Sequence, residues 1–412
     1  MPNSSDASPL SQTQSSTAAI NLRIFSAVVL TFICYLSIGI PLAVLPGFIH
    51  GNLGYSSFIA GLGVSIQYAA TLLTRPFAGR SIDSLGPKRA VQIGLLACIG
   101  SGVFLLLTAL LHAVPLLSLL MLVISRMTLG FAESMISVGA MSWGIGQVGM
   151  SHTPRVIAWN GVATYSAIAI GAPVGVAMEQ HWGLVSLGLL AIALPAIGYL
   201  LAYAKTAVAV VAHGEALAFR HVLWRVLPMG LGLGLGTIGF GSIATFITLY
   251  YTSFTWAGAA YCLSAFGFTF VCVRLLLAHT IHRFGGFRVA LVSYPIEFAG
   301  LLIIWLAPSP AWALLGAALT GAGFSMIFPA LAVEAMALVP SRNRGAAISA
   351  YSVFFDISLG ITGPVAGLLI GQYGYPSVYL FAAMAALLAL AIIIRSWRNY
   401  RPQPEVSPTT NQ

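Results

Sequence analysis

The chain has 412 residues, of which 58% are hydrophobic and only 7% are charged, and its formal net charge at pH 7 is +9. Soluble domains are about half apolar and about a quarter charged, so this composition excludes a soluble globular protein with a polar surface. The apolar residues form long runs, which predicts a protein of the lipid bilayer, where apolar side chains can face outward.

The apolar runs also predict how often the chain crosses the membrane. A spanning helix needs about 20 predominantly apolar residues, and runs of this length must be helical because the bilayer core offers no water to the backbone. The sequence contains twelve such runs, at 24–46, 56–78, 90–111, 116–138, 157–178, 184–204, 226–250, 258–278, 288–307, 311–335, 345–371 and 376–395. We therefore expect an all-α integral membrane fold with twelve transmembrane helices.

The placement of the basic residues predicts the orientation of these helices. If the N-terminus is cytoplasmic, seventeen of the eighteen Lys and Arg residues fall on the inner side, and Arg126 is the exception in mid-span. This is a strong positive-inside bias, and it favours an even number of spans with both termini in the cytoplasm. Membrane topology thus accounts for the net charge, and no nucleic-acid partner is expected.

Two pairs of matching segments indicate an internal repeat. Arg75 begins "RPFAGRSIDSLGPKR" and Arg274 begins "RLLLAHTIHRFGGFR", which share the spacing of Arg, Gly and Arg at an offset of 199 residues. Pro173 in "GAPVG" matches Pro364 in "TGPVAG" at an offset of 191 residues. Two matches with similar offsets predict a duplicated six-helix unit. The expected segments are a disordered tail at 1–21, a bundle at 22–204, a cytoplasmic linker at 205–221, a second bundle at 222–396 and a tail at 397–412.

The arrangement resembles the major facilitator superfamily over residues 22–396. "GRSIDSLGPKR" (79–89) resembles the family's loop signature between helices 2 and 3, "RMTLG" (126–130) its helix 4 motif, and "GAPVG" (171–175) the helix 5 signature of drug/proton antiporters. "WNGVATYSAIAIGAPVG" and "FDISLGITGP" are similar to the YhhS-type subgroup of bacterial efflux permeases. The resemblance implies two pseudo-symmetric six-helix bundles in the bacterial inner membrane, with a substrate site at the midplane between them.

The charged loop is a candidate cytoplasmic gate. The resemblance implies that Asp83 meets helix 11 and closes the inner side, where Arg342 and Arg344 are natural partners. The alternative is that the loop charges only fix the topology. In the second half His282 replaces the acid, so that loop has either drifted or carries a group that titrates near neutral pH. The gate candidates are Gly79, Arg80, Asp83, Gly86, Lys88, Arg89, His282, Arg342 and Arg344.

Charged residues inside the spans are candidates for proton coupling, because each costs at least about 2.5–3.5 kcal/mol at mid-depth. They are Asp356, Arg126, Glu133 and Glu297. Asp356 lies near the middle of helix 11 and is the preferred proton site, with a hydrogen bond to Ser or Thr as its alternative. Arg126 matches the family's motif residue, which is associated with proton handling. Glu133 could instead pair with Arg155, and Glu297 could be a packing group on an outer helix.

Two further sets of residues bear on the substrate. The helix 5 signature comprises Gly171, Pro173 and Gly175, which the resemblance links to antiport, although an ordinary proline kink explains the same pattern. The expected cavity wall comprises Tyr35, Gln67, Phe246, Tyr250 and Tyr351. Aromatic faces suit cationic or amphipathic solutes, and packing against neighbouring helices is the alternative role.

The function predicted from these features is secondary transport. The chain contains no P-loop, HExxH or GxSxG motif, so we do not expect an enzyme, and we expect neither cofactor nor metal. We predict a proton-coupled antiporter that exports a small organic or drug-like solute by alternating access and functions as a monomer in the bilayer. One alternative is a proton symporter or uniporter that imports a small metabolite, and a second is a non-transporting membrane sensor on the same scaffold.

Overall fold

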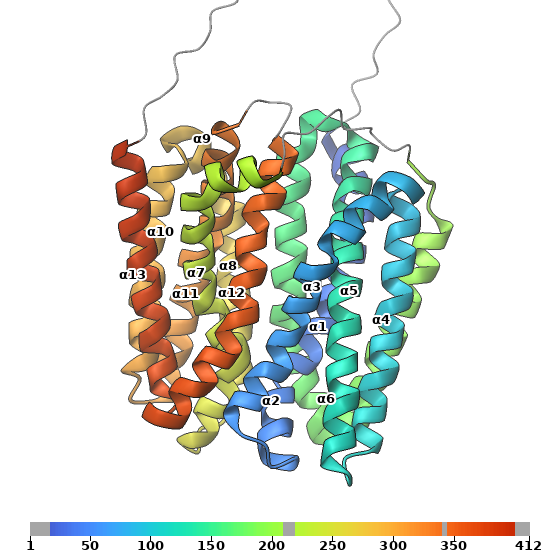
Figure 1. The fold of residues 1–412 in the computed structure, drawn as a ribbon, viewed down its shortest axis with the longest axis vertical. Helices are drawn as coiled ribbons and strands as arrows, with labels where there is room; N and C mark the ends of the chain where they lie inside the picture. Colours follow the sequence, from blue (N-terminus) through green and yellow to red (C-terminus); the bar gives the residue numbers. More distant parts are fainter. Residues whose placement is uncertain (1–16, 209–218, 340–343, 400–412) are drawn as a thin grey trace, which may run out of the picture.

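Every regular element is helical in the computed structural model, which describes residues 17–208, 219–339 and 344–399. The first group of elements comprises α1 (Thr17–Leu42), α2 (Leu45–Gly47), η1 (Phe48–Asn52), α3 (Ser57–Leu85), α4 (Pro87–Leu110), α5 (Pro115–Val148), η2 (Met150–His152) and α6 (Thr153–Ala204). The second comprises α7 (Phe219–Ser253), α8 (Ala260–Leu277), α9 (His279–Phe284), α10 (Gly286–Trp305), α11 (Pro310–Ala337), α12 (Arg344–Tyr373) and α13 (Pro376–Asn399). Figure 1 shows the two groups side by side.

The described residues contain eleven helices that are long and apolar enough to cross a membrane. One of them, α6, has 52 residues and would measure about 78 Å if straight, more than twice the ~30 Å hydrocarbon core. It is divided at Gly183, whose backbone is not helical (φ 69°, ψ 178°). Gly175 packs against Ile40 of α1 before this point, and Gly188 packs against Leu106 of α4 after it. The α6 segment therefore supplies two crossings, which gives the twelve that the apolar runs predict.

Some helix ends differ from the predicted spans. The first span was expected at 24–46, but α1 ends at Leu42 and is followed by the short elements α2 and η1. Pro41 and Pro46 lie around this break, and each proline removes one backbone donor. At the other extreme, α5 continues to Val148, ten residues beyond the predicted end, because its last turns pack on the rest of the bundle through the buried Trp143.

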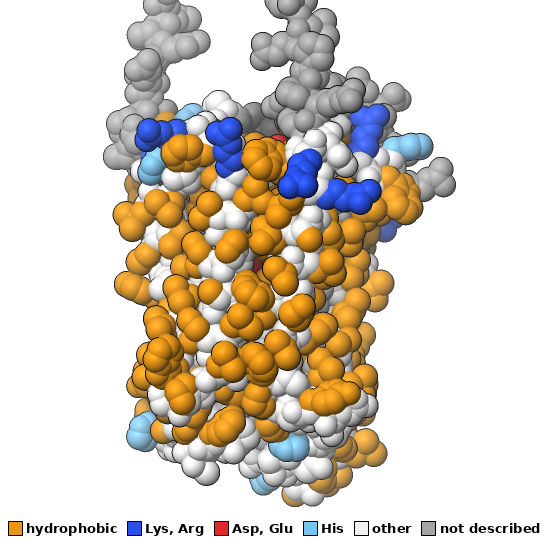
Figure 2. All heavy atoms as spheres, turned by 90° about the vertical axis from the view of Figure 1, so that its left-hand side faces the viewer, with side chains coloured by type: hydrophobic (Ala, Val, Ile, Leu, Met, Phe, Trp, Pro, Cys, Tyr) orange, Lys and Arg blue, Asp and Glu red, His pale blue; other side chains and the backbone are white. Residues whose placement is uncertain are grey.

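The outer surface has the pattern expected of a membrane protein. Large apolar side chains such as Leu73, Leu200 and Leu276 remain exposed. A soluble monomer rarely exposes so much apolar surface to water, whereas a membrane protein covers it with lipid. Figure 2 shows one face on which apolar side chains cover the middle, and Lys and Arg gather at the end where α13 finishes. We call that end the inner end and the opposite one the outer end.

Two seams join the first group of helices to the second: α3 packs along α12, and α6 packs along α8. On the α3–α12 seam, the hydroxyls of Ser57 and Tyr375 lie 3.3 Å apart at the outer end. Further in, Ser65 donates a hydrogen bond of 2.9 Å to the carbonyl of Leu359. The α6–α8 seam brings together residues such as Ser264 and Ala169, 95 positions apart, and the α3–α12 seam joins Ser57 and Tyr375, 318 positions apart.

The predicted repeat is visible in the backbone at its two loops. Gly86 has φ 85° and ψ 157°, and Gly285 has φ 84° and ψ 157°. Each glycine donates to the carbonyl of an isoleucine four residues earlier, Ile82 or Ile281. Positive φ is costly for any residue with a Cβ, so both turns depend on glycine.

One part of the sequence interpretation was wrong. Arg75 and Arg274 were counted among the basic residues of the inner loops, but they lie within the spanning helices α3 and α8. The side chain of Arg75 is 24% exposed, and Arg274 is only 4% exposed. The positive-inside bias survives without them, and both arginines become candidates for a functional role.

Candidate functional site

A buried ion pair connects the two halves across the α3–α12 seam. The Nε of Arg75 contacts one carboxylate oxygen of Asp356, and its Nη2 donates to the other oxygen at 2.9 Å. Asp356 is 1% exposed. The bond is therefore bidentate, the geometry in which an arginine and a carboxylate interact most strongly. Within the described residues this is the one ion pair, and it replaces the Ser or Thr hydrogen bond considered for Asp356.

Glu133 forms the centre of a second buried polar cluster, inside the first half. The hydroxyl of Tyr35 donates to Oε1 at 2.9 Å, and Gln67 Nε2 and the Thr71 hydroxyl each donate to Oε2 at 3.1 Å. Glu133 is only 2% exposed. Three neutral donors thus take the place of the ion pair with Arg155 that the sequence left open.

Arg126 joins this cluster through an amide. Its Nη1 donates to Gln67 Oε1 at 3.3 Å, and the amide nitrogen of the same Gln67 donates to Glu133. Arg126 and Glu133 are both buried and lie seven residues apart on α5, about two turns and ~10 Å along the axis. They therefore lie on nearly the same face of α5, and Gln67 links the two charges.

Helix α3 carries both clusters on successive turns. Gln67, Thr71 and Arg75 are spaced at intervals of four residues, so each lies about 6 Å further along the axis and on nearly the same face. The first two contact Glu133 on α5, and the third contacts Asp356 on α12. A movement of α3 relative to α12 would consequently change the surroundings of Asp356, and those of Glu133 would change if α3 also moved relative to α5.

Glu297 is isolated from these clusters. It lies on α10, is fully buried, and neither of its side-chain oxygens has a hydrogen-bond partner in the described structure. Its neighbours on α7 are Gly236 and Gly239, and a Cβ on Gly239 would lie 2.9 Å from Oε1. No described group would compensate a charge there, so Glu297 is a weaker candidate for a cycling proton site than Asp356.

Comparison with known proteins identifies the family. The family model described as Major Facilitator Superfamily matches residues 27–332 and 229–412. The chain belongs to this superfamily. It is 58% identical over 377 residues to an uncharacterized MFS-type transporter of Burkholderia pseudomallei strain 1106a, covering 92% of each chain. It is 54% identical over 382 residues to one of Pseudomonas aeruginosa strain UCBPP-PA14, covering 93% of this chain and 95% of the relative.

Solved structures share the major facilitator fold. The human organic anion transporter MFSD10 (TETRAN) superposes with a TM-score of 0.70 at 16% identity, covering 91% of this chain and 99% of that one. The nucleoside transporter NupG superposes with a TM-score of 0.67 at 16% identity, covering 90% and 99%. The family model and the two bacterial relatives make the chain a multi-pass membrane protein of a transporter superfamily, not of an enzyme family.

The superfamily's loop signature lies at the inner end, between α3 and α4. Arg80, Asp83 and Arg89 are exposed there, and Asp83 has no hydrogen bond or ion pair with any described residue. Gly79 lies within α3, and a Cβ on it would meet no atom within 4 Å, so it needs no close approach. Arg342 lies outside the described residues, as does the side chain of Arg344.

The other two gate candidates, Lys88 and His282, make no hydrogen bond or ion pair with the opposite half among the described residues. Lys88 donates to the carbonyl of Tyr203 at 2.9 Å and to that of Lys205, which ties the start of α4 to the end of α6 within one half. Lys205 in turn donates to the carbonyl of Ser26, and burial lowers the pKa of its ammonium group. His282 is exposed on α9.

The glycines of the helix 5 signature pack within the first half. Cβ atoms on Gly171 and Gly175 would lie less than 3.0 Å from the backbone of Ile40 on α1. Pro173, by contrast, faces a cavity of about 400 Å³ at the outer end, between α6 and the α7–α8 turn. Gln180 and Trp256 also line this cavity. The observed role of the two glycines is close helix packing.

The predicted cavity residues divide into two groups. Tyr35 and Gln67 donate hydrogen bonds to the Glu133 carboxylate, as described above. The other three are buried. Tyr250 donates to the carbonyl of Ile304 at 2.9 Å and Tyr351 to that of Phe328 at 3.1 Å, both within the second half. The ring of Phe246 reaches the first half, 2.9 Å from the point where a Cβ on Gly61 of α3 would stand. Packing is thus the role that the structure gives to these three.

The sequence analysis overlooked Arg75 and Thr71 as site residues. Arg75 was taken as a loop charge, although its position inside the second apolar run, 56–78, was a signal of burial. Thr71 carried no signal of its own. Its role becomes visible only when Gln67, Thr71 and Arg75 are placed on one face of a helix opposite two carboxylates.

Proposed function

We propose that this protein is a proton-coupled antiporter that exports a small organic solute from the bacterial cytoplasm, with Asp356 as the proton site and Arg75 as its partner. The observation that carries the proposal is the bidentate Arg75–Asp356 pair, buried on a seam between the two halves. A carboxylate in this position links its own protonation to the closure of the seam.

The coupling follows from the charge of the two side chains. While Asp356 is ionised, it holds Arg75 and draws α3 against α12. A proton on Asp356 removes the negative charge, and the bidentate bond is lost while the partly exposed Arg75 is left without a partner. The seam then opens more readily. Because α3 and α12 also contact each other at the outer end, through Ser57 and Tyr375, opening this seam exposes the site to the outside.

Export results if the two states alternate. Asp356 takes up a proton while the outer end is open, and it releases the proton to the cytoplasm when the halves close there and the pair with Arg75 re-forms. The solute travels in the opposite direction. One proton moving down ~100 mV supplies about 2.3 kcal/mol, and since 1.4 kcal/mol is tenfold, it supports a gradient of roughly fiftyfold.

The Glu133 cluster is the second part of the proposed coupling site. It lies one helical turn from Arg75 on α3, and its three donors come from α1 and α3. Movement of α3 changes the number of donors around the carboxylate, and Arg126 is carried with it through Gln67. Export, as opposed to import, is supported by the resemblance to the YhhS-type efflux permeases and by the antiporter signature at residues 171–175.

The proposal is tested in everted membrane vesicles that carry a pH gradient. A panel of fluorescent solutes is screened for loss from cells that contain the wild-type protein, and each exported solute is then added to the vesicles. We expect solute addition to release protons from the vesicle lumen with the wild type and not with Asp356→Asn. Glu179→Gln, which removes a carboxylate four residues before the non-helical Gly183 of α6, is the matched control.

The sign of the proton movement separates antiport from the alternatives. A symporter would move protons in the same direction as the solute, and a uniporter would move none. Proton-driven export that continues unchanged in Asp356→Asn would overturn the assignment of the proton site.

A further inference from the structure

Arg274 is a buried cation that faces the other seam. It lies on α8, is 4% exposed, and its Nη1 is 3.2 Å from the point where a Cβ on Gly161 of α6 would stand. The guanidinium therefore reaches from one half of the molecule to the other, and the absence of a side chain on Gly161 leaves room for it.

The hydrogen-bonding capacity of this guanidinium is largely unused. Arginine has five N–H donors, but the structure gives Arg274 one hydrogen bond, from Nη2 to the carbonyl of Ser325 on α11. Its Nε is buried without an acceptor. No described carboxylate pairs with it.

The repeat shows what is missing. Arg274 matches Arg75, and Asp356, the partner of Arg75, lies eight residues before Pro364. Eight residues before the matching Pro173 is Tyr165. The second seam therefore has the arginine of the first seam and, in place of its acid, an uncharged aromatic residue.

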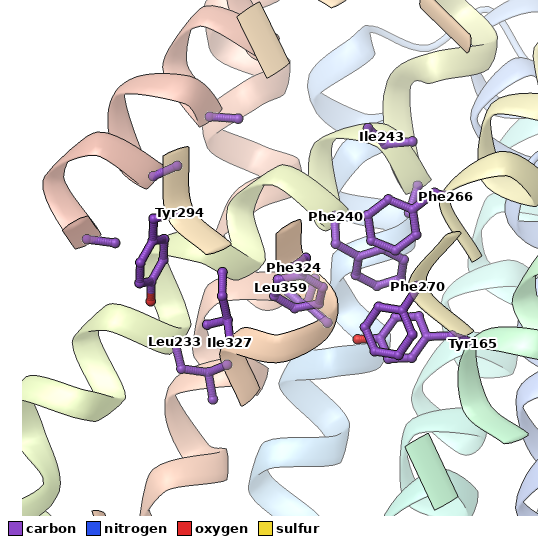
Figure 3. Close-up of a cluster of buried hydrophobic side chains, with 14 of the residues drawn as sticks. Tyr165, Leu233, Phe240, Ile243, Phe266, Phe270, Tyr294, Phe324, Ile327 and Leu359 are labelled. Carbon is purple, nitrogen blue, oxygen red and sulfur yellow. The ribbon is translucent and has the colours of Figure 1, made fainter. Parts of the chain in front are cut away.

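An aromatic cluster surrounds this position. Phe270 stacks on Tyr165 with ring centroids 3.7 Å apart, and the guanidinium carbon of Arg274 lies 4.8 Å from the centroid of Phe270. Figure 3 shows Tyr165 of α6 lying among the phenylalanines of the second half. The other rings within reach of Tyr165 are Phe240, Phe266 and Phe324.

From this geometry we infer that Arg274 and the aromatic cluster form a binding site for an amphipathic organic anion, in which the guanidinium binds the acidic group and the rings bind an apolar body. This inference rests on the proposed transport function, because the α6–α8 seam must part for a solute to enter. A buried charge in the membrane costs free energy, and an incoming carboxylate can satisfy the fork of N–H groups in bidentate fashion. A cationic solute would instead be repelled by Arg274.

Binding is tested at equilibrium with three probes that share one aromatic body: 2-naphthoate, 2-naphthylmethylammonium and 2-naphthylmethanol. A ligand that binds only the folded protein raises its melting temperature, which is measured on the full-length purified chain as the monodisperse fraction left after heating. We expect stabilisation by the carboxylate, and none by the ammonium compound at the same concentration.

Variants at Arg274 locate the anion. We expect Arg274→Gln to weaken 2-naphthoate binding about ten- to hundredfold, the range for a hydrogen bond to a charged group. Arg283→Gln should leave it unchanged, because Arg283 is exposed and stacks on its neighbour Phe284 at 5.2 Å. Preferential stabilisation by the ammonium compound, no stabilisation by 2-naphthoate, or equal binding by Arg274→Gln would each overturn the site.

A second variant keeps the test decisive if Arg274→Gln does not fold. Tyr165→Asp places a carboxylate where the first seam has Asp356, so it should occupy Arg274 and abolish 2-naphthoate binding. Tyr165→Asn loses the same ring without adding an anion, so it should bind 2-naphthoate more weakly than the wild type but more tightly than Tyr165→Asp. Equal binding by these two variants would contradict the inference. No proton gradient is present in these measurements, so their failure and that of the Asp356→Asn vesicle test can be told apart.

Discussion

Arg75 and Arg274 occupy matching positions in the two halves, 199 residues apart, but only Arg75 has a carboxylate partner among the described residues. The loops that follow them keep the same backbone conformation at Gly86 and Gly285. The duplicated unit has thus kept its architecture and changed its charge. One seam is closed by an internal anion, and the other holds a cation with unused donors, so the two seams can respond to different ligands.

Substitutions of Arg75 and Asp356 should have non-additive effects on the free energy of unfolding. Removing one member of a buried pair costs about 3–5 kcal/mol, and because Arg75 is 24% exposed we expect Arg75→Gln to lie near the lower end. The double variant with Asp356→Asn should lose less than the sum of the singles, with an interaction energy of at least about 1 kcal/mol. Unfolding in detergent measures all three variants.

Arg395→Gln serves as the control for this cycle. Arg395 is exposed near the end of α13, so its replacement should change the free energy of unfolding by less than about 0.5 kcal/mol. Additive single effects would mean that the pair contributes no energy as a pair.

The Glu133 cluster predicts an order of destabilisation. Glu133→Gln removes the negative charge to which all three donors point, and its NH₂ group fits only where the Tyr35 hydroxyl turns from donor to acceptor. Each hydrogen bond to a charged group contributes about 1.5–3 kcal/mol. Tyr35→Phe loses a single bond at a partly exposed position. Melting temperatures should therefore fall further for Glu133→Gln than for Tyr35→Phe, and the reverse order would contradict the geometry.

Most of the fold was predictable because its causes are local. Runs of apolar residues and the absence of water in the bilayer determine the helices, and the repeated Arg–Gly–Arg spacing indicates the duplication. The exceptions have local causes too. Gly183 lies between two predicted spans. It is the one residue of α6 whose backbone is not helical, so α6 continues on both sides of it as a single element. The first span ended early, beside Pro41.

The site was less predictable because its contacts join distant segments. Asp356 and Glu133 could be singled out as acids within apolar runs, since such residues are costly there. Their partners could not be chosen from spacing alone: Arg75 is 281 positions from Asp356, and Tyr35 is 98 from Glu133. Phe246, Tyr250 and Tyr351 illustrate the converse, since an aromatic residue in a span has the same sequence signal whether it packs or lines a cavity.

Replacing Asp83 should slow transport without changing the free energy of unfolding of the protein in this conformation. Asp83 is exposed and makes no hydrogen bond or ion pair with the described residues, so Asp83→Asn should shift the free energy of unfolding by less than about 0.5 kcal/mol. If Asp83 meets a partner at the start of α12 only when the inner end closes, Asp83→Asn should slow export. Ser84→Ala, which loses a hydroxyl bonded to the carbonyl of Arg80, should change neither quantity. Parallel losses of stability and export in Asp83→Asn would indicate a structural role instead.

The α3–α12 seam should open at its outer end when its glycines are enlarged. A Cβ on Gly61 would lie less than 3.0 Å from the backbone of Gly363, and one on Gly363 would lie equally close to Gly61. Backbone atoms cannot swing aside as the end of a side chain can, so Gly61→Ala and Gly363→Ala should push the two helices apart. Gly371→Ala, on the same α12 but with no atom within 4 Å, is the matched control.

Labelling from outside the cell measures this opening. Ser57 is buried beside Tyr375 at the outer end of the seam, so Ser57→Cys, in a background without the native cysteines, should react slowly with a membrane-impermeant maleimide. Either seam variant should raise this rate severalfold, while Gly371→Ala leaves it unchanged. Unaltered labelling in both seam variants would mean that the glycines serve helix packing alone, and that closure of the outer end does not depend on the α3–α12 contact.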